Sequence, residues 1–250
     1  VSCVAAMRWF REQVFFSRDY SDIPRQLLEY SEDQNMLKVI FDYAKAADLG
    51  IYDMHFEFER QELREGAVLS DNIPDKIKTA LIQFMHALEE SSNSGEVRLR
   101  MGEVTAKASH QGENRDGQRA MYQLELSDES DGTRKLMALA PAVESALRNG
   151  GILLVDEIER ELHPILVNYI VAKFQSKASN PYGAQLIFTT HNTELMNLEL
   201  LRKDQIYFVD KNNEDGTSEL YSISEFSTRT SENIRKGYLV GKYGATPDIE

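Results

Sequence analysis

The stretch GILLVDEIE, residues 151–159, decides the fold, because in it an apolar run ends abruptly in acidic side chains. A second run of this kind, QLIFTTHN at residues 185–192, ends in polar side chains, and residues 165–174 between the two read as a helix. Short, continuous apolar runs are typical of strands that are covered on both faces of a parallel sheet. Strand, helix and strand in this order predict a βαβ unit and an α/β fold.

The rest of the chain combines helical and strand-like patterns. Helical patterns occupy residues 5–16, 33–47, 74–88 and 133–148. Strand-like patterns occupy residues 52–59, 96–101, 120–126, 206–210 and 219–224. The last two flank turn-forming residues and predict a hairpin. We therefore expect a mainly parallel core sheet with an antiparallel portion and a helical insertion.

The composition limits the class of protein. The chain has 250 residues, enough for one large domain or two modest ones, and no stretch approaches the roughly 20 apolar residues of a membrane span. A single cysteine, Cys3, fits a reducing cytoplasm, so we expect a cytoplasmic protein with no membrane partner. The net charge of -13 argues against non-specific DNA binding. His55, His86 and His110 show no metal-ligand spacing with one another or with Cys3.

Asp156 and Glu157 end the first apolar strand. In open α/β sheets ligands bind at the carboxyl ends of the strands, where two adjacent carboxylates are costly unless a ligand uses their charge. Phosphoryl transfer uses it, because one carboxylate helps to hold Mg²⁺ and the next orients or deprotonates the attacking water. The alternative is a strand that ends in a solvated acidic loop.

His191 follows the second apolar strand, between Thr190 and Asn192. A neutral imidazole at a strand end can donate a hydrogen bond to a γ-phosphate or align the attacking water. Alone, such a histidine is more often a loop residue or the neighbour of a helix cap. Its pairing with the acidic strand, in this order along the chain, favours a phosphate site.

A short polar segment, Ser130, Asp131, Gly132 and Thr133, precedes the apolar stripe of the helix at residues 133–148. Free backbone amides and the positive end of the helix dipole attract phosphate oxygens at such a position. Simple capping of the helix by Ser130 or Asp131 is the alternative.

This order of motifs resembles the ABC-type ATPases, including SMC-like heads. ESDGTRKL at residues 129–136, FTTHN at 188–192 and YLVGKYGA at 238–245 further resemble the AAA-family ATPases of bacterial abortive-infection and restriction-linked phage-defence loci. The resemblance implies a P-loop NTPase head fragment that binds ATP and Mg²⁺. It makes Asp156 the Walker B magnesium carboxylate, Glu157 the catalytic glutamate, His191 the switch histidine, and Ser130, Asp131, Gly132 and Thr133 the signature segment that binds nucleotide.

The resemblance also implies partners. Two heads would sandwich two ATP molecules, so that a nucleotide-driven homodimer controls an effector, a nuclease or toxin, in antiphage defence. Residues 161–164 lie where the family places a subunit-contact segment. One alternative is a SMC- or RecF-like head of DNA repair or recombination, with DNA as its partner. Another is an inactive ATPase-like scaffold.

One departure from the family is large, because the P-loop pattern G-x-x-x-x-G-K-[ST] does not occur in these 250 residues. In the family this loop lies in an N-terminal lobe. We expect residues 1–95 to form a mixed, largely helical insertion that follows the missing lobe. Residues 96–250 should form the ATPase core with a C-terminal hairpin and tail. Alone, the chain should bind ATP weakly and hydrolyse little or none.

Overall fold

The computed structural model describes residues 3–17, 21, 23–48, 50–63, 75–91, 99–212, 215–226 and 233–246, with side chains left out at 60–63, 85–91 and 99–101. The chain divides into two compact units, Val1–Tyr20 with Asp131–Glu250, and Ser21–Ser130. This division differs from the expected one between residues 95 and 96. The physical reason is that, within each unit, strands that lie far apart in the sequence pair with one another, as described below.

The first unit holds a parallel sheet with the strand order β1-β5-β6. Its strands are β1 (Val14–Phe16), β5 (Ile152–Val155) and β6 (Gln185–Phe188), and its helices are α1 (Cys3–Gln13), α5 (Asp131–Asn149) and α6 (Pro164–Gln175). The succession β5, α6, β6 is the predicted βαβ unit, and β5 pairs with β6 in parallel. The mixed α/β class with a parallel core sheet is therefore confirmed.

One expected helix ends early. The pattern over residues 5–16 predicted a single helix, but α1 ends at Gln13 and the next three residues form β1. Val14, Phe15 and Phe16 pair in parallel with Ile152–Leu154. Aromatic and β-branched side chains suit a strand, and this distant partner overrides the local helical pattern.

The long helix α5 packs its apolar stripe inward as predicted. The stripe residues are all buried, namely Leu136, Leu139, Ala140, Val143 and Leu147. Pro141 lies inside the helix and is buried too. The buried stripe holds α5 against the core. The helix ends at Asn149, and two glycines separate it from β5.

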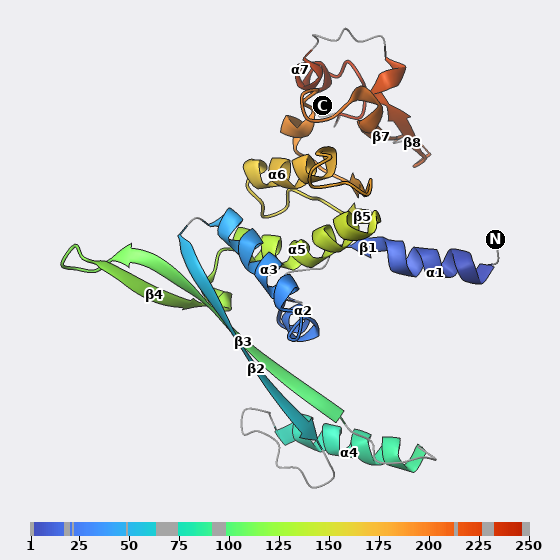
Figure 1. Cartoon of the computed structure of the whole chain (residues 1–250). Helices are drawn as coiled ribbons and strands as arrows, with labels where there is room; N and C mark the ends of the chain where they lie inside the picture. The colour runs from blue at the N-terminus through green and yellow to red at the C-terminus, as the bar shows by residue number, and fades with distance from the viewer. Residues whose placement is uncertain are drawn as a thin grey trace. The chain divides into compact units, whose positions relative to one another are not determined.

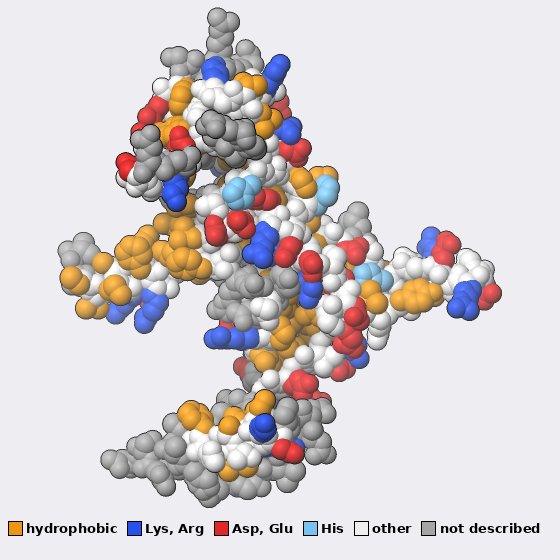
Figure 2. Space-filling view, turned by 180° about the vertical axis from the view of Figure 1, so that it is seen from behind, with side chains coloured by type: hydrophobic (Ala, Val, Ile, Leu, Met, Phe, Trp, Pro, Cys, Tyr) orange, Lys and Arg blue, Asp and Glu red, His pale blue; other side chains and the backbone are white. Residues whose placement is uncertain are grey.

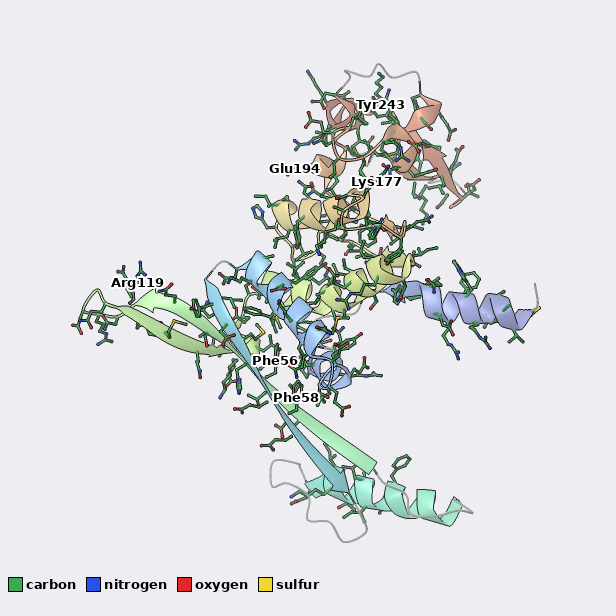
Figure 3. All side chains as sticks on the ribbon, in the orientation of Figure 1. Phe56, Phe58, Arg119, Lys177, Glu194 and Tyr243 are labelled. Atoms are coloured by element: carbon green, nitrogen blue, oxygen red, sulfur yellow. The ribbon has the colours of Figure 1, made fainter. Side chains whose placement is uncertain are left out.

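The last third of the first unit is built around aromatic rings. It contains the predicted hairpin of β7 (Tyr207–Lys211) and β8 (Ser218–Ser222), then α7 (Ile234–Leu239), and the 3₁₀ turns η3 (Thr193–Leu195), η4 (Lys203–Gln205) and η5 (Ile223–Glu225). The ring of Phe208 stacks on Tyr238 and Tyr243. The tail is tied down because the hydroxyl of Tyr221 donates to the backbone carbonyl of Tyr243 at 2.6 Å. Tyr243, labelled in Figure 3, is only 2% exposed.

The second unit is an antiparallel sheet with helices. Its elements are α2 (Ile23–Glu29), α3 (Gln34–Ala47), β2 (Ile51–Leu63), α4 (Asp75–Ser91), β3 (Leu99–Glu113), β4 (Arg119–Glu125) and the turn η2 (Leu126–Asp128). The strand order is β2-β3-β4. Figure 1 shows β2 and β3 as two long strands that run together, and β3 pairs with β2 out to Leu63. Because of this pairing, β2 and β3 belong to one unit and no boundary falls between them.

The local predictions for this unit agree with its elements. Asp33 caps α3, because its Oδ1 atom accepts the backbone N–H of Met36 at 3.0 Å. Along β2 the side chains alternate, with Met54 buried and the two phenylalanines labelled in Figure 3, Phe56 and Phe58, half-buried. Within the described residues, no helix is both long and apolar enough to cross a membrane.

Candidate active site

The ends of two neighbouring strands bring the predicted residues together. β5 and β6 are adjacent and parallel, and Val155 lies opposite Phe188 at the end of the register. The backbone continues this pairing, since the amide of Thr189 donates to the carbonyl of Val155 at 3.1 Å and the amide of Ile158 to the carbonyl of Thr189 at 3.1 Å. Asp156, Glu157 and His191 therefore leave the same edge of the sheet.

Thr189 holds the acidic pair in place, although the motif analysis did not single it out. The Thr189 hydroxyl donates to Oδ1 of Asp156 at 2.5 Å. The hydroxyl oxygen of Thr189 also accepts the backbone N–H of Glu157 at 2.8 Å. One side chain thus fixes both the carboxylate of Asp156 and the backbone of Glu157. The signal in the sequence is weak, because it consists only of a hydroxyl residue directly after the strand.

Glu157 and His191 face each other across the strand ends. Oε1 of Glu157 lies 3.5 Å from Nε2 of His191, and their side chains are 44% and 86% exposed. Both groups are open to a ligand from solvent. In such a pair the carboxylate can accept a proton from water, and a ring N–H of the imidazole can donate a hydrogen bond to an anion.

The backbone at this edge is held in an uncommon conformation. Glu157 has φ 47° and Glu161 has φ 65°, both in the left-handed region. For a residue with a Cβ atom this conformation costs about 1–2 kcal/mol. Strain of this kind persists where the surrounding contacts dictate it, and it concentrates at functional sites.

Glu159 supports the histidine loop, a second role that sequence reasoning missed. Its Oε1 atom accepts the backbone N–H of His191 at 2.6 Å. Burial acts to raise the pKa of Glu159, but hydrogen bonds from the Thr190 side chain and the His191 backbone outweigh it, and the pKa is lowered. The carboxylate therefore stays ionised near neutral pH and keeps the loop seated. In the space-filling view of Figure 2, acidic and basic side chains are mixed over the visible surface, with single histidines among them.

The predicted signature segment opens α5, and the boundary between the two units falls within it, after Ser130. Asp131 is the first residue of the helix and pairs with the guanidinium of Arg134. Ser130 and Asp131 are exposed and Gly132 is half-buried, whereas Thr133 is only 1% exposed. Exposed backbone and side-chain groups at Ser130 and Asp131 can meet a ligand, while the Thr133 side chain is packed inside.

Comparison with known proteins assigns most of this chain to one family. A family model described as "AAA domain, putative AbiEii toxin, Type IV TA system" matches residues 10–197, a stretch that includes both strand ends and the start of α5. A curated relative, the "Retron Vc95 probable ATPase" of Vibrio cholerae serotype O1 biovar El Tor, is 40% identical over 63 residues. That stretch covers 25% of this chain and only 12% of the relative.

Proposed function

The chain belongs to this family of AAA-domain proteins, and from that premise we propose that it hydrolyses ATP at the carboxyl ends of β5 and β6. The observation that carries the proposal is the arrangement around Thr189. A fixed carboxylate, Asp156, stands next to a glutamate that faces a histidine. A carboxylate that holds Mg²⁺ and a residue that orients or deprotonates the attacking nucleophile are recurring parts of phosphoryl-transfer sites.

Each group has a distinct task in this proposal. Asp156 offers a carboxylate oxygen of the kind that Mg²⁺ takes, and it is oriented by the Thr189 hydroxyl, so it would hold the ion directly or through water. The ion would neutralise charge on the phosphates. Glu157 would orient the attacking water and accept its proton, and His191 would donate a hydrogen bond to the γ-phosphate. Thr189 and Glu159 keep these side chains in position.

We propose that two copies sandwich ATP, as the resemblance to ABC-type ATPases implies. In this arrangement a phosphate bound at the strand ends of one copy meets the signature segment of the other. Ser130 and Asp131, the first residues of that segment, are exposed at the start of α5.

The cradle for the β- and γ-phosphates has to come from residues outside these 250, because they contain no P-loop pattern. A row of apolar side chains supports a further layer on the parallel sheet. Phe16, Leu154 and Ile187 are in register across β1, β5 and β6, yet Phe16 is 65% and Ile187 55% exposed. Parallel sheets normally have both faces covered. We expect the P-loop-bearing segment to cover this row.

We further propose a role in antiphage defence, in which the ATPase cycle controls an effector. Membership of a family that is described as a putative AbiEii toxin of a Type IV TA system, and similarity to a probable retron ATPase, support this role. The DNA-repair alternative is less well supported, because the net charge is -13.

The test uses the full-length native protein. We expect the Glu157→Gln variant to lower kcat about 10²- to 10⁴-fold, because a general base is lost while the shape is kept. Glu219→Gln, the same change on the exposed strand β8, serves as the matched control and should leave kcat unchanged. Wild-type turnover in Glu157→Gln would refute the proposal. A native chain with no P-loop would refute it in favour of an ATPase-like scaffold.

A further inference from the structure

Three side chains from three separate segments of the second unit converge on one another. Asp48 directly follows α3, His110 lies on β3, and Glu129 lies between η2 and α5. One ligand atom from each, two carboxylate oxygens and one ring nitrogen, all lie within 4.8 Å of one another. Nε2 of His110 is 2.7 Å from Oε1 of Glu129.

The charge of this cluster is not balanced by its own members. The side chains of His110 and Glu129 are 17% and 3% exposed, so the Glu129 carboxylate is almost fully removed from water. Two carboxylates and one imidazole leave net negative charge even when the imidazole is protonated. Buried charge of this kind is costly unless it is paired or coordinates a metal.

The local backbone lets the three groups come close. Oδ1 of Asp48 accepts the backbone N–H of Gly50 at 2.7 Å, which leaves its second oxygen for another partner. A Cβ atom at Gly50 would lie 3.0 Å from Oδ1 of Asp48 and 3.4 Å from Nδ1 of His110. A larger residue at position 50 would therefore crowd the two ligands.

We propose that Asp48, His110 and Glu129 bind a divalent transition-metal ion of the zinc class. An imidazole with two carboxylates suits Zn²⁺, whereas Mg²⁺ and Ca²⁺ prefer all-oxygen sites. Metal–ligand bonds of about 2.1 Å place the ligands of a tetrahedral ion about 3.4 Å apart. The Nε2–Oε1 distance of 2.7 Å would then open by about 0.7 Å, a small side-chain movement. Water would complete the coordination.

The ion would link β3 to Glu129, the residue that precedes Ser130. The site does not depend on the proposed ATPase function.

The site could not be found from the sequence, because its ligands come from segments far apart along the chain. Spacing rules look for ligands that are close in sequence, and they found none.

The experiment is a calorimetric titration of Zn²⁺ into the chelator-treated chain, repeated with Co²⁺, whose visible absorption reports tetrahedral ligands. We expect one saturable ion per chain. Asp48→Asn keeps the oxygen that accepts from Gly50 and should abolish saturable binding without unfolding, as checked by circular dichroism. His110→Ala should abolish it as well.

His55→Ala is the matched control, because His55 faces Glu57 at 3.4 Å on an exposed stretch of β2 and belongs to no three-ligand cluster among the residues that the structure describes. This variant should bind Zn²⁺ like the wild type. Absence of saturable binding in the wild type would overturn the proposal, and so would binding that survives both Asp48→Asn and His110→Ala. In either case Asp48, His110 and Glu129 do not form a metal site.

Discussion

Replacing Thr189 with valine removes one hydroxyl and keeps the shape of the side chain. The hydroxyl makes two hydrogen bonds, to Asp156 and from the amide of Glu157. A net hydrogen bond contributes about 0.5–1.5 kcal/mol, and since Thr189 is exposed we take the lower part of that range for each. Thr189→Val should therefore lower the free energy of unfolding by about 1–2 kcal/mol.

The functional effect of Thr189→Val should be larger, because the freed Asp156 carboxylate loses its orientation. Loss of a residue that orients a metal ligand typically costs about 10- to 100-fold in metal affinity or activity. Urea unfolding of the chain measures the first effect, and the Mg²⁺ dependence of ATP turnover in the P-loop-containing protein measures the second. Thr189→Ser restores the hydroxyl and should recover both. A valine variant with wild-type stability and wild-type Mg²⁺ dependence would refute the reasoning.

Substitutions at three further positions probe strain, charge and packing by urea unfolding. Because Glu161 has φ 65°, Glu161→Gly should be neutral or stabilising while Glu161→Val should cost about 1–2 kcal/mol, and equal effects would argue against backbone strain. The folded-state pKa of Glu159 is lowered from its ordinary value of 4.5, so its contribution to the free energy of unfolding is present above pH 4.5 and is lost as pH falls through the folded pKa. Glu159→Gln should reduce this loss of stability at acid pH, and an unchanged pH profile would contradict the assignment. A Cβ atom at Gly237 would lie 2.8 Å from the ring of Tyr243, so Gly237→Ala should destabilise the C-terminal part, with a loss of about 1–3 kcal/mol, whereas no loss would show that the ring can move.

The core of the parallel sheet could be predicted from the sequence, because its signals are local. Continuous apolar runs identified β5 and β6, and the helical stripe identified α5, without knowledge of any distant partner. The positions of Asp156, Glu157 and His191 at one edge followed from the parallel arrangement of the two strands. Their roles in catalysis stay predictions.

The remaining features depend on contacts between distant residues. β1 looks like the end of a helix until Val14–Phe16 pair with β5. Thr189 and Glu159 gain their roles only when β6 brings the histidine loop against the acidic one. The boundary between the units followed from the pairing of β3 with β2, which no local pattern indicates.

The ribbon of β2 and β3 has a mechanical consequence. β2 has 13 residues and is therefore about 43 Å long. It is paired along this length with β3. If the two strands tilt together as a rigid ribbon, a tilt of about 5° at one end moves the other end by about 4 Å, which is close to the spacing of neighbouring strands. A displacement of that size is large enough to make or break a hydrogen-bonded contact.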